Sequence, residues 1–82
     1  MSGLQRILVA AKADLAPWEP IPEAQWPRIA AQCGPEEAVE IHHRIAALEA
    51  ELAAVQSWDG DTQIEIKRAI EFFQGILSLM PR

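Results

Sequence analysis

Residues 35–56 read PEEAVEIHHRIAALEAELAAVQ, and this stretch decides the fold. Its inward positions recur at alternating intervals of three and four residues, which is the heptad pattern of packed helices. Pro35 follows Gly34 at the position where proline favours a helix start, and no further Gly or Pro interrupts the stretch. The stretch therefore predicts one long helix with a single apolar seam. The seam consists of Ala38, Ile41, Ile45, Leu48, Leu52 and Val55.

A second seam follows a short polar break at residues 57–61, which read SWDGD. Thr62 stands three residues before Glu65, the spacing of a capping box at a helix start. A link this short favours antiparallel packing of the two helices that it joins. We therefore expect an all-α fold built on an antiparallel helical hairpin at about 35–56 and 62–80. The second seam consists of Ile66, Ile70, Phe73, Leu77 and Met80.

The N-terminal part of the chain predicts less regular structure. Residues 2–15 have the apolar spacing of a short amphipathic helix. Residues 16–34 contain four prolines, which break any long helix, so we expect an ordered connector with helical turns within about 23–33. Length allows one domain, residues 1–82. Gly75 lies inside the last predicted helix, where a close helix crossing would explain it.

The last predicted helix has more apolar surface than one neighbouring helix can cover. Phe72, Ile76 and Leu79 form a second row beside its seam. The first helix and the connector could cover this row within one chain. A second copy could instead cover it in a homodimer that completes a helical bundle, and dimerisation is a common remedy for a thin core. Trp18 and Trp26 in the connector either close the open face of the hairpin or form a docking arm. These five residues are the candidate interface.

The charge balance excludes one class of partner. The net charge is −5, and residues 13–61 hold ten acidic residues against Arg28 and Arg44. Nucleic-acid binding needs a basic stripe, so we expect no direct contact with nucleic acid. The acidity serves solubility, or it forms a docking face for a basic partner. The candidate residues of that face are Glu36, Glu37, Glu40 and Glu51.

Cysteine content and hydropathy point to the cytoplasm. Cys33 is the single cysteine, so an intramolecular disulfide is excluded, and we expect a small buried hydrophobe there. The sequence has no signal-peptide pattern and no run approaching the ~18 apolar residues of a membrane span. No membrane association is expected.

One constellation suggests metal chemistry. Glu40 and His43 have the Glu-x-x-His spacing that helical-bundle di-iron proteins use. With Ile41 facing inward, however, both side chains point outward, so a site would need a subunit interface. Surface positions for both, and for His42 beside them, are the alternative.

The sequence therefore predicts a small acidic protein–protein interaction module that acts by binding, without catalysis or cofactor. An assembly factor, a chaperone-like subunit or an inhibitor of a larger complex would fit, with a second copy or a larger protein as partner. The alternative is a ferritin-like or di-iron metal-binding protein with Glu40 and His43 at a subunit interface.

Overall fold

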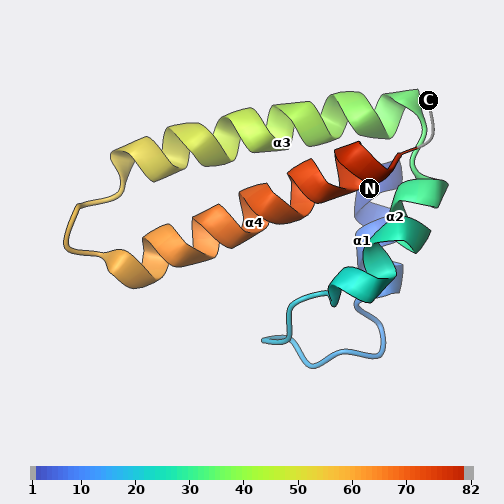
Figure 1. The fold of residues 1–82 in the computed structure, drawn as a ribbon, viewed down its shortest axis with the longest axis horizontal. Coiled ribbons are helices and arrows are strands. Elements are labelled where there is room, and N and C mark those ends of the chain that lie inside the picture. Colours follow the sequence, from blue (N-terminus) through green and yellow to red (C-terminus); the bar gives the residue numbers. More distant parts are fainter. Residues whose placement is uncertain (1, 81–82) are drawn as a thin grey trace.

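The computed structural model describes residues 2–80, and every regular element in that range is helical. The expectation of an all-α fold is therefore confirmed (Figure 1). In chain order the elements are α1 (Gly3–Ala11), the 3-10 turn η1 (Glu23–Gln25), α2 (Trp26–Gln32), α3 (Pro35–Ala54) and α4 (Gly60–Leu79).

The two long helices run side by side in opposite directions (Figure 1). Pro35 occupies the first turn of α3, and the Glu37 carboxylate accepts a hydrogen bond from the Gly34 N–H at 3.3 Å. The sequence pattern placed the start of α4 at Thr62, and this was wrong. Asp59 is the N-cap, because its side chain accepts from the Thr62 N–H at 3.3 Å and so starts the helix at Gly60.

The first helix is shorter than the apolar spacing predicts. Ser2 caps α1 by accepting from the Gln5 N–H at 3.1 Å, and the helix ends at Ala11. Beyond it, the Leu15 N–H bonds to the Lys12 carbonyl at 3.0 Å. This tight turn replaces the next helical turn and keeps Leu15 packed against the core.

The connector contains the expected helical turns, η1 and α2. Pro27 lies in the first turn of α2, where proline has no hydrogen bond to lose, so it starts that helix instead of breaking it. Trp26, just before it, turns its indole toward α4 and donates from Nε1 to the Ile21 carbonyl at 3.3 Å.

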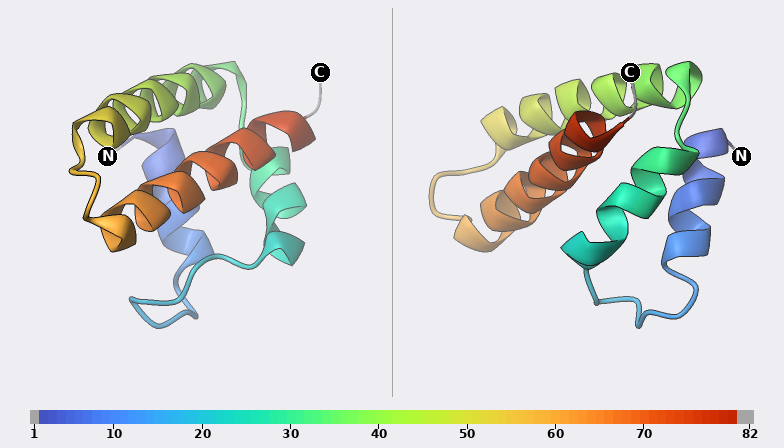
Figure 2. Two further views of the ribbon diagram at one scale, coloured as in Figure 1. Left: turned by 60° about the vertical axis from the view of Figure 1, so that its left-hand side comes forward. Right: turned by 45° about the vertical axis from the view of Figure 1, so that its right-hand side comes forward.

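The helices form an L. α1 and α2 cross beneath one end of the α3–α4 pair, and the loop between α3 and α4 lies at the far end (Figures 1 and 2). The core lies at the corner, where all four helices meet. Its buried residues are Leu4, Ile21, Ile29, Ala30, Cys33, Ile41, Ile45, Phe73 and Ile76.

Gly75 shows why α2 and α4 pack so closely. A Cβ on Gly75 would lie 2.5 Å from Cζ3 of Trp26, so the indole occupies the space that a side chain would need. The same ring meets Phe72 edge-on, with ring centroids 5.6 Å apart. The close approach expected at Gly75 is therefore present, but the Trp26 indole approaches the glycine, and the backbone of another helix does not.

The long arm of the L is thinly packed. Between residues 46 and 70, Ile66 is the single buried residue, because only α3 and α4 contribute to this part of the molecule. We call these residues the arm, and residues 55–65, which are the loop and the start of α4, its tip. At the tip, Trp58 is 81% exposed and Ile64 is 49% exposed.

Candidate functional site

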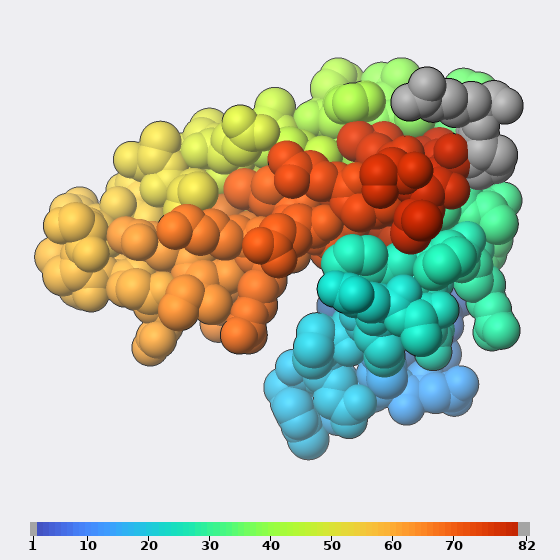
Figure 3. All heavy atoms as spheres, in the orientation of Figure 1, coloured from blue at the N-terminus to red at the C-terminus, as the bar shows by residue number. Residues whose placement is uncertain are grey.

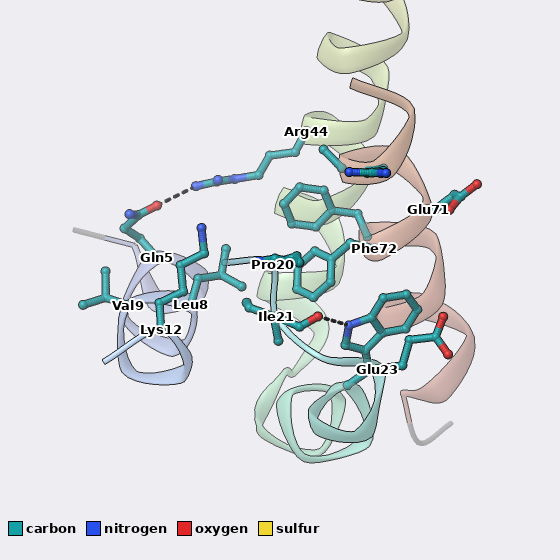
Figure 4. A pocket seen from close by; sticks show the side chains of 14 residues that line it. Gln5, Leu8, Val9, Lys12, Pro20, Ile21, Glu23, Arg44, Glu71 and Phe72 are labelled. Carbon is teal, nitrogen blue, oxygen red and sulfur yellow. Dashed lines mark hydrogen bonds between the residues drawn. The ribbon is translucent and has the colours of Figure 1, made fainter. Parts of the chain in front are cut away.

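The inner corner of the L contains an open groove with a volume of about 510 Å³. α1 forms one wall, α4 the opposite wall, and the connector closes the floor (Figure 4). In the space-filling view, the hollow lies where the arm meets the part of the molecule formed by α1, the connector and α2 (Figure 3). Its apolar lining comes from Leu8, Val9, Pro20, Ile21, Trp26, Ala69, Phe72 and Phe73.

Packing fixes the aromatic side of this groove. Phe72 lies between Trp26 and Phe73, with ring centroids 5.6 and 5.2 Å away and both contacts edge-on. Such pairs each stabilise by about 0.5–1.5 kcal/mol beyond their buried area. With the indole also hydrogen-bonded to Ile21, this wall is formed before anything binds.

The groove is more basic than the protein around it. Lys12, Arg44 and Arg68 line it against Glu23 and Glu71, whereas the whole chain has seven basic and twelve acidic residues. Arg44 is paired with Glu40. Lys12 and Arg68 are therefore the cations that the groove offers, and they favour an occupant that carries both apolar and acidic groups.

Arg44, which lines the groove, is hydrogen-bonded to α1. Its guanidinium donates to Gln5 Oε1 at 3.1 Å, pairs with Glu40 at 3.2 Å and lies 6.0 Å from the centre of the Phe73 ring. Glu40 also accepts from the Ser2 hydroxyl at 2.9 Å. This network joins the start of α1 to α3.

The structure separates the five candidate interface residues. Ile76 is 1% exposed and Phe72 is half-buried, because α2 covers the second row of α4 within one chain. Trp26 is part of that cover. Trp18 is 83% exposed and Leu79 is 46% exposed. Ile76 is thus unavailable to a partner, and of the two connector tryptophans only Trp18 projects into solvent.

The proposed acidic face is also divided. Glu36 and Glu51 are exposed, but Glu37 binds the Gly34 N–H and Glu40 binds Ser2 and Arg44. The four carboxylates therefore do not form one continuous unpaired surface.

The metal candidates are not brought together with further ligands. The Glu40 carboxylate is engaged by Arg44, while His42 and His43 are exposed on α3. Within residues 2–80, no three His, Cys, Asp or Glu side chains lie in an arrangement that could hold a metal ion.

Cys33 belongs to the core. It is 7% exposed at the end of α2, and burial, followed by the nearby Glu37 carboxylate, raises the pKa of its thiol. A thiol held in its neutral form is a poor nucleophile and a poor ligand. Cys33 contributes a buried side chain to the core.

Comparisons with known proteins do not place the chain in a family. No family model, curated protein or solved structure matches it. Among the described residues, no helix combines the length and the apolar character needed to cross a membrane.

The sequence patterns missed the groove and its cations. Arg68 carries a local signal, because it stands four residues before Phe72 and therefore shares a helix face with it. Lys12 and Arg44 come from other helices, so only the folded chain brings them to the same groove.

Proposed function

We propose that this protein is a small interaction module that acts by binding another polypeptide in the groove, without catalysis. The observation that carries the proposal is the groove itself, which is apolar, open and walled by a packed aromatic cluster. Concave apolar sites with a few convergent polar groups are the usual form of binding sites. An assembly factor, a chaperone-like subunit or an inhibitor would all act in this way.

The groove favours a polypeptide over a small polar substrate. Val9 on its rim is 50% exposed, and Trp18 projects from the same connector that forms its floor. Exposed apolar side chains around an apolar hollow extend the contact area beyond the hollow. A single cysteine suits a reducing compartment, so we place this binding in the cytoplasm.

Site-specific photo-crosslinking in cells that express the chain tests the proposal. A photoreactive phenylalanine analogue at Val9 reports on the groove rim, and the same residue at Val39 on α3, 56% exposed, is the matched control. We expect a discrete protein adduct from position 9 that position 39 does not give. Equal labelling at both positions, or none at position 9, would show that the groove is not a binding surface.

The adduct should also depend on groove chemistry. Lys12 and Arg68 are exposed, so changing both to Gln removes charge without disturbing the core. We expect this double change to weaken crosslinking at position 9, and raised salt to do the same. Insensitivity to both changes would assign the contact to the apolar walls alone.

A further inference from the structure

The groove has a complement on the same molecule, at the tip of the arm. There Trp58 and Ile64 are exposed, and Asp59, Asp61 and Glu65 lie beside them in sequence. The tip is therefore apolar and acidic, whereas the groove is apolar and offers the cations Lys12 and Arg68. Within one chain the two lie at opposite ends of the arm, so they cannot meet (Figure 1).

One face of α4 joins these two regions. Asp61, Glu65, Arg68 and Phe72 are spaced by four, three and four residues, which puts them on one side of the helix. Phe72 and Arg68 line the groove, and the two acids continue the same face toward the tip. Read from the tip to the corner, this face is acidic, then basic, then apolar.

We propose that the occupant of the groove is the arm of a second copy of this chain, in a reciprocal dimer with a twofold axis. This inference rests on the proposed binding role of the groove and names its partner. Two antiparallel α4 helices would place Glu65 of each copy opposite Arg68 of the other. Each tip would then approach the groove of its neighbour, so the contact is closed and does not grow into a fibre.

The shape of the molecule supports this arrangement. The arm extends from the corner of the L, and the molecule measures 37 × 27 × 23 Å along its principal axes. Two such L shapes can interlock, each arm lying in the inner corner of the other. A stable interface needs about 800 Å² per partner, roughly one seventh of the 5857 Å² surface of one chain.

The dimer also accounts for the thin core of the arm. Residues 46–70 bury only Ile66, and two helices alone form a marginal structure in water. A second copy lying along α4 would give the arm a third and a fourth helix to pack against. It differs from a dimer that buries the whole second apolar row of α4, because Ile76 of that row is already buried within one chain.

Charge-reversal pairing tests the proposal on the full-length chain. Light scattering across a concentration series should give the wild-type chain a mass of twice 9.1 kDa. Arg68→Glu places acid opposite acid across the axis, and Glu65→Arg places base opposite base. Each variant alone should associate at least about tenfold more weakly than the wild type.

The decisive result is the mixture of the two variants. Glu65→Arg and Arg68→Glu chains should form a one-to-one heterodimer, because each changed residue then meets an opposite charge. Lys67→Glu, one residue away on another side of α4, is the control and should leave the wild-type dimer intact. Circular dichroism should show that all variants remain folded.

Three outcomes would overturn the dimer: a monomeric wild-type chain, a dimer that Arg68→Glu leaves unchanged, or variants that do not associate when mixed. Crosslinking at Val9 shows whether only the dimer is rejected or the binding role of the groove is rejected as well. An adduct with a different protein would reject the second copy but keep the groove as a binding site. No adduct at all would reject both.

Discussion

At the scale of single residues, the contact between Gly75 and Trp26 fixes how closely α2 approaches α4. The indole occupies the position of a missing side chain and is held by its hydrogen bond to Ile21. The Trp26 ring is packed against α4 and hydrogen-bonded to the Ile21 carbonyl, so it has little room to move. Gly75 therefore matters for packing, although glycine weakens the helix that contains it.

Gly75→Ala should destabilise the protein in spite of its better helix propensity. Overpacking costs about 1–3 kcal/mol and the better helix propensity returns about 0.5–1 kcal/mol, so we expect a net loss of up to about 2.5 kcal/mol. Urea unfolding followed by circular dichroism measures this change. Gly60→Ala is the matched control, since nothing lies within 4 Å of its added Cβ. Equal stability of the two variants would contradict the packing role of Trp26.

Cys33 gives a residue-scale prediction about pH. Burial raises its thiol pKa in the folded chain above the ordinary value of 9.0, which the unfolded chain keeps. Above that pH the unfolded chain releases the proton before the folded chain does, so the free energy of unfolding should fall as pH rises. Below it, this group should have no effect.

Unfolding of wild type and Cys33→Ala in urea, at neutral pH and above pH 9.0, checks this sign. Subtracting the stability change of the variant from that of the wild type isolates the contribution of the thiol. We expect the wild type to lose more stability than the variant as pH rises. Parallel pH dependence would mean that the thiol ionises in the folded chain as it does in the unfolded one.

At the scale of elements, α1 is the most lightly attached helix. Ser2 both caps it and donates to Glu40, and Arg44 joins Gln5 to α3. Exposed polar contacts of this kind contribute little each. Leu4 supplies the one fully buried anchor of the helix.

Ser2→Ala should therefore loosen α1 before the rest of the fold. Loss of the cap costs about 1 kcal/mol, and amide hydrogen exchange should accelerate in residues 3–11 more than in α3. Ser57→Ala, at an exposed serine in the loop after α3, is the control. Uniform acceleration across all helices would show that α1 does not open on its own.

The same elements show what the sequence could and could not predict. α3 and α4 follow from heptad spacing, because that pattern is local and the helices pack along it. Helix ends were less accurate, since Asp59 competes with Thr62 as a cap and a tight turn ends α1 early. The groove was not predictable, because its lining comes from three helices and the connector. No local pattern contains that information.

At the scale of the whole molecule, one core joins every helix. Its buried residues come from α1, the connector, α2, α3 and α4, with Ile41 of α3 fully buried. A small domain with one shared core is expected to unfold in a single transition.

Ile41→Ala should shift that single transition as a whole. The lost side chain and the cavity it leaves cost about 2–5 kcal/mol, a large part of the stability of a small domain. Near-ultraviolet circular dichroism, which follows the packed Trp26, and far-ultraviolet circular dichroism, which follows the helices, should move together. Val39→Ala, on the exposed side of α3, should shift neither. Separate transitions would indicate that the arm and the corner unfold independently.

The order in which the helices pack has a consequence for biosynthesis. α2 packs mainly on α4, so this helix does not meet its main partner until much later residues have been made. From Gln32 to Leu79, translation at about 5–20 residues per second takes roughly 2–10 seconds. Throughout that interval the Trp26 indole lacks its contacts with Phe72 and Gly75 of α4. The shared core cannot be completed before α4 has been made, and an uncovered aromatic side chain before that stage favours aggregation.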